Sequence, residues 1–210
     1  MRGLYLVTPD WDDTGRLLEA TRQALEAGAT LVQYRNKTAG EALREEQAAA
    51  LLALCRRHGR PLVINDHVEL CLRLGADGVH VGGLDAPVAA VRAALGPNRI
   101  VGASCYGQFA LAQAAQDAGA SYVAFGGFYP SKVKVYEVST PPDIVARAKA
   151  QLAVPVVAIG GMTAENARPL VGLGADMVAA ISSVYLAEDV FGAASEFAEL
   201  FVGWSPHAHA

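Results

Sequence analysis

The stretch Leu74-Gly75-Ala76-Asp77 marks a junction between a helix and a strand, and closely similar words recur along the chain. A glycine in this setting ends a helix in the left-handed conformation that side chains with a Cβ disfavour. The apolar run 78–81 that follows has the length of a buried strand. The other junctions of this kind are Glu26-Ala27-Gly28-Ala29-Thr30, Ala118-Gly119-Ala120-Ser121 and Leu173-Gly174-Ala175-Asp176. Four such junctions indicate repeated helix-to-strand units.

Outward from these junctions, short β-like runs alternate with longer runs of helical spacing. The predicted strands are 4–8, 31–35, 61–65, 78–81, 100–104, 122–126, 155–160 and 177–182. The predicted helices are 15–27, 41–58, 67–74, 87–95, 108–118, 143–152, 164–173 and 189–201. Eight such units predict an α/β fold, a single (β/α)8 TIM barrel over residues 1–203, with a disordered C-terminal tail at 204–210. An open doubly wound sheet is the alternative, but its Gly-x-Gly-x-x-Gly turn is absent after the first strand.

Composition and charge limit the classes of protein to consider. Hydrophobic residues make up 52% of the 210 residues, which is enough for a large core and argues against disorder. The formal charge of −4 favours neither nucleic acid nor an anionic membrane as a partner. The chain shows neither a signal peptide nor an apolar run of transmembrane length, so we expect a cytoplasmic protein. Cys55, Cys71 and Cys105 are odd in number and widely spaced, which predicts reduced, mostly buried thiols.

The second predicted strand turns from apolar to polar along the stretch Leu31-Val32-Gln33-Tyr34-Arg35-Asn36-Lys37. Alternate side chains of a strand share a face, so Gln33 and Arg35 point the same way and Lys37 continues their row. Ligands of parallel α/β folds bind at the carboxyl ends of the strands. An exposed strand end that its charges keep soluble is the alternative, although Asn36 and Thr38 offer these cations no carboxylate to pair with.

Two carboxylates, Asp66 and Asp85, follow neighbouring predicted strands. One or two carboxylates together with substrate phosphates are the usual protein ligands of Mg²⁺. The alternative for each is to cap the helix that follows, and Pro87 supports this for Asp85. Asn65 ends an apolar strand, so its amide needs partners, either in a ligand or in a bridge between strands.

A second anion site is predicted where the seventh and eighth strands end. Gly160-Gly161 and Ser182-Ser183 stand where barrels of this type bind phosphate through backbone N–H groups. A separate cluster of Arg35, Lys37, Asn65 and Lys134 suits a diphosphate, and Gln33, Tyr106 and Phe128 suit flat rings between the two sites. We assign no role to His67 or His80, because a lone histidine beside a core strand is more often structural. Two anion sites require two substrates.

At these residues the chain resembles the thiamine phosphate synthase family over nearly its whole length. The motifs that carry the resemblance are Val32-Gln33-Tyr34-Arg35-Asn36-Lys37, Ile64-Asn65-Asp66, Gly75-Ala76-Asp77-Gly78-Val79-His80, Gly102-Ala103-Ser104-Cys105-Tyr106, Tyr122-Val123-Ala124-Phe125-Gly126 and Val157-Ala158-Ile159-Gly160-Gly161. The resemblance implies a transferase of thiamine biosynthesis, which joins 4-amino-2-methyl-5-(diphosphooxymethyl)pyrimidine to thiazole phosphate and releases pyrophosphate. It further implies one Mg²⁺ ion and a dissociative substitution, and the nucleophilic thiazole nitrogen demands no general base.

The resemblance also implies roles for individual residues. Residues that would hold the pyrimidine diphosphate are Gln33, Tyr34, Arg35, Asn36, Lys37, Asn65, Ser104 and Lys134, of which Arg35, Lys37, Ser104 and Lys134 would be catalytic. Residues that would hold the thiazole phosphate are Ser131, Lys132, Val133, Gly161, Ile181 and Ser182. Asp66 and Asp85 would ligate Mg²⁺. The expected partners are these small-molecule substrates, and a homo-oligomer is left open.

Some residues depart from the family pattern. The family commonly has Gln or Glu where Gly83 stands and Thr where Val133 stands, and the segment 135–139 is less basic and less glycine-rich than expected. A thiazole tautomerase of the same fold is one alternative, but it takes its proton shuttle from a histidine after the fifth strand, where this chain has Tyr106. A non-catalytic sensor of phosphate ligands is another. Such a sensor would not need the residues expected to bind the diphosphate and its metal, which this chain retains: Arg35, Lys37, Asp66, Asp85 and Lys134.

Overall fold

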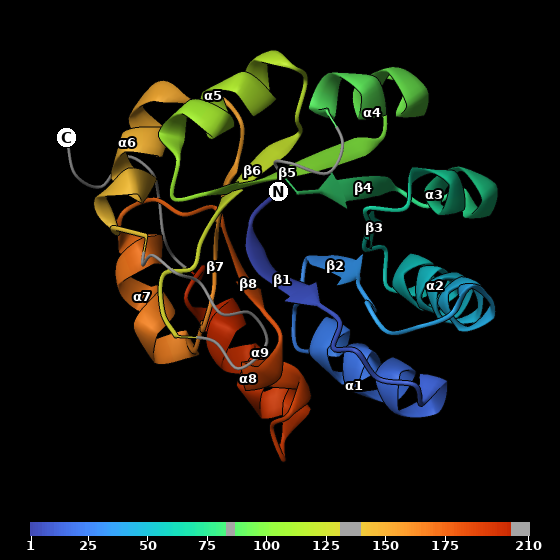
Figure 1. Cartoon of the computed structure of the whole chain (residues 1–210). Helices are drawn as coiled ribbons and strands as arrows, with labels where there is room; N and C mark the ends of the chain where they lie inside the picture. The colour runs from blue at the N-terminus through green and yellow to red at the C-terminus, as the bar shows by residue number, and fades with distance from the viewer. Residues whose placement is uncertain (83–86, 131–139, 203–210) are drawn as a thin grey trace.

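A computed structural model describes residues 1–82, 87–130 and 140–202. Its strands form one closed parallel barrel in chain order, and β8 pairs with β1 to complete it (Figure 1). The strands are β1 Gly3–Val7, β2 Leu31–Tyr34, β3 Leu62–Asn65, β4 Gly78–Val81, β5 Ile100–Tyr106, β6 Tyr122–Phe125, β7 Val156–Ile159 and β8 Met177–Ala180. The predicted (β/α)8 barrel is therefore confirmed, and the open-sheet alternative is wrong. The predicted tail, 204–210, lies outside the described residues.

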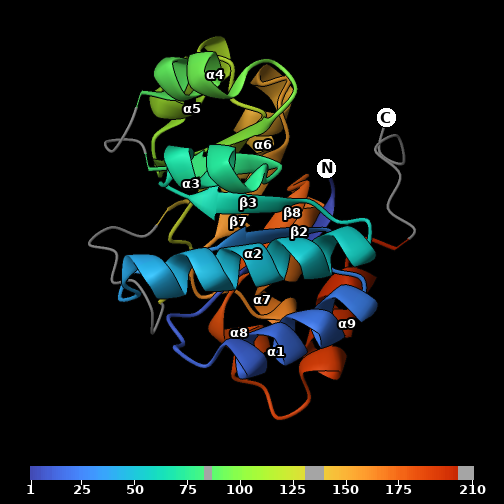
Figure 2. The same cartoon turned by 90° about the vertical axis from the view of Figure 1, so that its right-hand side faces the viewer.

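Helices surround the barrel, and Figure 2 shows α2 lying across its outer face beside β2 and β3. They are α1 Thr14–Glu26, α2 Glu41–Arg57, α3 Val68–Leu74, α4 Val88–Leu95, α5 Phe109–Asp117, α6 Asp143–Gln151, α7 Ala164–Gly172, α8 Ser182–Tyr185 and α9 Val190–Glu199. The sequence did not predict α8. Its first residue, Ser182, was expected to end the eighth strand, which ends at Ala180 instead.

Two of the recurring helix-to-strand junctions carry an aspartate that bonds to the neighbouring strand and helps to fix the register. Gly75 ends α3 with a φ of 67°, as its position in the word predicts. Asp77, just before β4, then makes two hydrogen bonds to the first residue of the neighbouring strand β3. Asp77 Oδ2 accepts the N–H of Leu62 at 2.8 Å, and the Asp77 N–H donates to the Leu62 carbonyl at 3.0 Å. Asp176 makes the same pair of bonds to Val156, at 2.8 and 2.9 Å. These aspartates form part of the amino-terminal rim of the barrel.

The strand alternation divides the apolar residues between two cores. One set fills the barrel interior and comprises Tyr5, Val7, Leu31, Val63, Tyr122, Ala124, Val157, Met177 and Ala179. The other and larger set packs between the barrel and its helices. Gly102 makes room for Tyr122 in the interior, because a Cβ at Gly102 would lie 2.1 Å from Tyr122 Cζ. Large aromatic side chains can therefore cross the inside of this barrel.

Cys55, Cys71 and Cys105 are free and buried, as the sequence predicts. Burial raises the pKa of Cys55 and of Cys105 to about 12 and that of Cys71 to about 11. None of the helices in the described part of the chain combines the length and apolarity needed to cross a membrane.

Candidate active site

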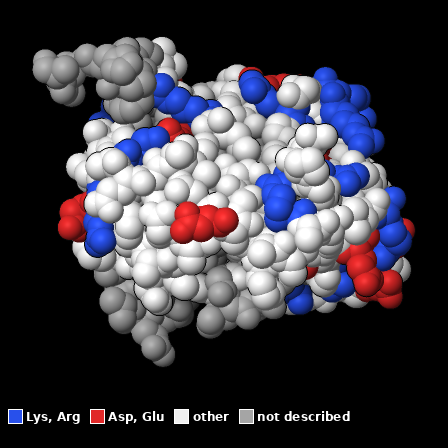
Figure 3. Space-filling view, turned by 90° about the horizontal axis from the view of Figure 1, so that it is seen from above, with Lys and Arg blue, Asp and Glu red and all other residues white. Residues whose placement is uncertain are grey.

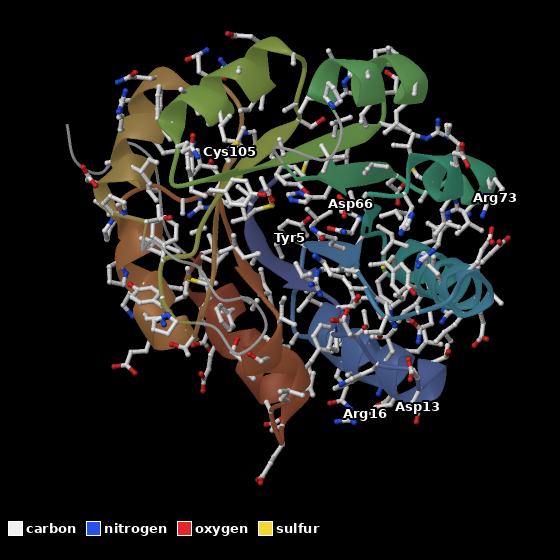
Figure 4. The ribbon with its side chains drawn as sticks, in the orientation of Figure 1. Tyr5, Asp13, Arg16, Asp66, Arg73 and Cys105 are labelled. Atoms are coloured by element: carbon white, nitrogen blue, oxygen red, sulfur yellow. The ribbon has the colours of Figure 1, made fainter. Side chains whose placement is uncertain are left out.

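A cavity opens at the carboxyl ends of the strands, where catalytic sites of such barrels lie. Its walls come from the inward-facing positions of the strands and from the loops that follow them. In Figure 4, Tyr5 and Asp66 lie near the middle of the barrel, whereas Asp13, Arg16 and Arg73 lie at the helical periphery. The lining residues are Tyr5, Val7, Gln33, Arg35, Lys37, Asn65, Asp66, His80, Gly82, Ser104, Tyr106, Ala124, Val157, Ile159, Gly160, Gly161, Met162, Ala179, Ile181, Ser182 and Ser183.

The row Gln33, Arg35 and Lys37 lines this cavity, as strand alternation predicts. Contrary to expectation, the Arg35 cation has a carboxylate partner. Arg35 Nη1 lies 3.2 Å from Asp10 Oδ1, and the same oxygen accepts the backbone N–H of Lys37 at 2.8 Å. Asp10 follows β1, so its approach to β2 depends on barrel closure and was not visible in the local pattern.

The structure places Tyr34 and Asn36 outside this cavity. Both alternate with the cavity row and turn toward α2, where Tyr34 OH and Asn36 Nδ2 donate to Gln47 Oε1 at 3.0 and 3.2 Å. Asn36 Oδ1 also accepts the backbone N–H of Ala39 at 3.0 Å, so its side chain shapes the loop after β2. Neither side chain lines this cavity, because strand alternation lets only every second residue face it, and the implied role of both residues in holding the pyrimidine diphosphate stays a prediction.

Asp66 presents its carboxylate to the cavity and does not cap α3. The helix begins after His67, and Asp66 Oδ2 accepts a hydrogen bond from Asn65 Nδ2 at 2.6 Å. Asp66 also has a φ of 61°, which is unusual for a residue with a side chain. Its backbone is held there by an N–H bond to the carbonyl of His80 at 2.9 Å. The capping alternative for Asp66 is thus wrong, and Asn65 bonds the carboxylate in place of bridging strands.

The ends of β7 and β8 form a corner of small residues and exposed backbone. Gly160 and Gly161 have φ values of 107° and 62°, and a Cβ at Gly161 would lie 2.2 Å from the carbonyl oxygen of Pro130. Ser182 begins α8 beside them, and the buried Ser183 Oγ has no hydrogen-bond partner among the described residues. Backbone N–H groups and hydroxyls that converge in this way suit an anion such as phosphate.

Comparison with known proteins identifies the family. Residues 4–184 match the family model of thiamine monophosphate synthase. The chain belongs to this family. It is 64% identical to a thiamine-phosphate synthase of Janthinobacterium sp. (strain Marseille) over 96% of this chain and 97% of the relative, and 50% identical to one of Thiobacillus denitrificans over 95% and 94%. A thiamine phosphate pyrophosphorylase from Pyrococcus furiosus superposes with a TM-score of 0.82, at 34% identity over 94% of each chain. The resemblance stated from the motifs is confirmed.

Several residues implied by the family resemblance fall outside the described residues. These are Asp85, Ser131, Lys132, Val133 and Lys134, together with the departing Gly83 and the segment 135–139. Ser104 lines the cavity, as do Gly161, Ile181 and Ser182. Phe128 does not, because its buried ring packs in the core between barrel and helices. The expectation that Phe128 faces a substrate ring is wrong, whereas Tyr106 does line the cavity.

Sequence patterns give no role to Tyr5, His80 and Tyr122, of which Tyr5 and His80 line the cavity and Tyr122 is fully buried. His80 Nε2 lies 2.8 Å from Ser104 Oγ, and His80 Nδ1 lies 2.9 Å from Tyr122 OH. Tyr122 OH in turn lies 2.6 Å from Tyr5 OH. The sequence alone favours a structural histidine at His80, without a role. The available signal was its inward register, because His80 pairs with Asn65 and Gly102 on the neighbouring strands.

One face of the molecule carries dispersed charges. Figure 3 shows one face on which Lys and Arg side chains lie in small separate groups amid mostly uncharged atoms. The cations of the cavity, Arg35 and Lys37, are instead placed together by the fold. These two cations line the same cavity, where they can bind an anionic small molecule.

Proposed function

We propose that this chain joins 4-amino-2-methyl-5-(diphosphooxymethyl)pyrimidine to thiazole phosphate and releases pyrophosphate, giving thiamine phosphate. One observation supports the proposal: a single cavity is lined by two groups of residues suited to anions, on either side of β1. Arg35 and Lys37 form the corner beside β2, and Gly161, Ser182 and Ser183 form the one at β7 and β8. The first corner suits a diphosphate and the second a monophosphate. The wall between them can take two aromatic rings.

The reaction breaks the bond between the pyrimidine methylene carbon and the diphosphate oxygen, and the thiazole nitrogen then bonds to that carbon. The leaving pyrophosphate takes the electron pair, so cations around it lower the barrier. Arg35, Lys37 and Lys134 are proposed for that role. By analogy with the removal of one oxyanion-hole donor in acyl transfer, the loss of one such electrostatic donor should cost about 3 kcal/mol of barrier.

The residues of this cavity fit a magnesium ion. Asp66 offers a carboxylate that lines the cavity, caps no helix and has no ion pair with a cation among residues 1–82, 87–130 and 140–202, and Asn65 donates a hydrogen bond to it. Asp66 and Asp85 together with diphosphate oxygens would hold one Mg²⁺, whose contribution when bound is to neutralise charge on the leaving group. Asn65 would hold the Asp66 carboxylate in the required direction.

Ser104 and Gln33 face the cavity from β5 and β2 and can hydrogen-bond to the pyrimidine diphosphate. No described group acts as a general base in this scheme, because the thiazole nitrogen already carries a lone pair. The tautomerase alternative would require a proton shuttle after β5, where Tyr106 lines the cavity. A cytoplasmic location stays a prediction, and a homo-oligomeric state stays open.

The test is pyrophosphate release, measured with both substrates and with each alone, in Mg²⁺ and then in EDTA. We expect release only with both substrates and the metal. Asp66→Asn should raise the Mg²⁺ concentration needed for half-maximal rate, and Glu199→Gln, at an exposed position at the end of α9, is the matched control. Thiazole isomerisation without the pyrimidine would favour the tautomerase, and binding of thiazole phosphate without turnover would favour the sensor.

A further inference from the structure

A continuous chain of hydrogen bonds crosses the inside of the barrel and connects two cavity residues. It begins at Gln33 Nε2, which donates to Tyr5 OH at 2.5 Å. Tyr5 OH lies 2.6 Å from Tyr122 OH, and Tyr122 OH lies 2.9 Å from His80 Nδ1. It ends with His80 Nε2 at 2.8 Å from Ser104 Oγ. Five different strands supply these residues, so their contacts depend on the closed barrel.

One direction along this series of hydrogen bonds places a donor at Ser104. The amide nitrogen of Gln33 can only donate, so the oxygen of Tyr5 accepts there, and between Tyr5 and Tyr122 either hydroxyl can be the donor. When Tyr5 donates to Tyr122, Tyr122 can donate to His80 Nδ1, and the proton of a neutral His80 ring is then on Nε2. In that arrangement His80 Nε2 donates to Ser104 Oγ, and the hydroxyl hydrogen of Ser104 is available to the cavity.

The two phenols in the middle of this series of hydrogen bonds, Tyr5 and Tyr122, are buried and stay uncharged. Tyr5 and Tyr122 are 1% and 0% exposed, and burial raises the pKa of each phenol above its ordinary value, so both stay protonated donors. Their rings meet edge to face, and the ring of His80 stacks on Tyr122 with an angle of 20° between planes. Gly102 is required beside Tyr122, because a Cβ there would collide with the phenol.

We propose that Tyr5, Tyr122 and His80 form a positioning relay that fixes Ser104 as a hydrogen-bond donor toward an acceptor atom of the pyrimidine diphosphate. The identity of the ligand rests on the proposed function, whereas the direction of the relay, from Gln33 to Ser104, is one of those that the hydrogen-bond distances permit. The relay also ties the orientation of Gln33 to that of Ser104. His80 acts through Ser104 and is a positioning residue.

The direction of the relay can be measured without substrate. In ¹⁵N-histidine-labelled protein, we expect the signal of His80 to show a protonated Nε2 and an unprotonated Nδ1, assigned among the five histidines by its loss in His80→Gln. Tyr122→Phe keeps the ring volume and removes the donor, so it should change the Nδ1 shift. A protonated Nδ1 in the unaltered protein would overturn the proposed direction.

Kinetics test whether the relay serves Ser104. A net hydrogen bond is worth about a 3- to 10-fold change in binding. His80→Leu should therefore raise the KM for the pyrimidine diphosphate about 10-fold and leave the KM for thiazole phosphate unchanged. His80→Gln should stay within about 3-fold, because its amide presents an acceptor and a donor at a spacing like that of the imidazole nitrogens.

A double variant separates this role from a general loss of structure. In a Ser104→Ala background, His80→Leu and Tyr122→Phe should have little further effect on that KM, because the group they position is gone. Fully additive effects in folded, active variants would overturn the relay. Protein that has the expected His80 tautomer but releases no pyrophosphate would instead contradict the proposed function and leave the direction of the relay intact.

Discussion

The guanidinium of Arg35 is paired with the carboxylate of Asp10 at the mouth of the cavity, with Arg35 Nη1 3.2 Å from Asp10 Oδ1. The same Asp10 oxygen accepts the backbone N–H of Lys37 at 2.8 Å. Asp10 therefore does two different things. It offsets part of the positive charge that a diphosphate needs, and it anchors the loop that presents Lys37.

Two substitutions of Asp10 separate these effects. Asp10→Asn keeps an oxygen for the Lys37 N–H and removes the charge, so the KM for the pyrimidine diphosphate should stay within about 3-fold of normal, because a partly exposed ion pair is worth little. Asp10→Ala also removes the anchor and should raise that KM about 10-fold, the value of one lost hydrogen bond. Steady-state kinetics for each substrate measure both. Equal effects of the two variants would show that the anchor is unimportant.

Removal of the Arg35 guanidinium should slow the chemical step. Arg35→Met is expected to lower kcat at least about 100-fold, because a cation beside the leaving pyrophosphate is lost. The control is Arg22→Met, on the outer surface of α1, where Arg22 pairs with Glu19 and Glu26. That variant should turn over normally. Near-normal pyrophosphate release by Arg35→Met would place the leaving group elsewhere.

Two glycine-to-alanine changes should have opposite effects on stability. At Gly102 an added Cβ would lie 2.1 Å from Tyr122 Cζ, so Gly102→Ala should lower the free energy of unfolding by roughly 3 kcal/mol, the upper part of the range for overpacked cores. At Gly172, in α7, an added Cβ meets nothing within 4 Å, and Gly172→Ala should stabilise by about 0.5–1 kcal/mol. Urea unfolding measures both. A neutral Gly102→Ala would mean that Tyr122 can move without cost.

These cases show which parts of the site a sequence can predict. Alternation along one strand placed Gln33, Arg35 and Lys37 correctly, because that relationship is local. Asp10 was missed because its contact with Arg35 joins the ends of two strands, and His80 was missed because its partners, Tyr122 and Ser104, lie on other strands. The repeated glycine words predicted the barrel itself, since eight buried strands of parallel type have few ways to close.

The three buried cysteines should be inert in the folded protein. Burial raises the pKa of Cys71 to about 11, and at pH 8 such a group is thiolate in only about one molecule in a thousand. Cys55 and Cys105 have pKa values raised further, to about 12. A thiol-specific chromogenic disulfide should therefore label none of them rapidly at pH 8 and all three in denaturant. Rapid labelling of one thiol in the native protein would contradict its burial.

Asp176 should matter for stability and not for turnover. Its Oδ2 accepts the N–H of Val156 at 2.8 Å and pairs with Lys149 Nζ at 2.7 Å, at the rim opposite the cavity. Asp176→Ala leaves the Val156 N–H without this acceptor and should lower the free energy of unfolding by about 2 kcal/mol, with pyrophosphate release unchanged. Lys149→Met removes only the partly exposed cation and should cost about 1 kcal/mol or less. If the lysine variant proves as destabilised as the alanine variant, the ion pair and not the strand anchor holds this rim.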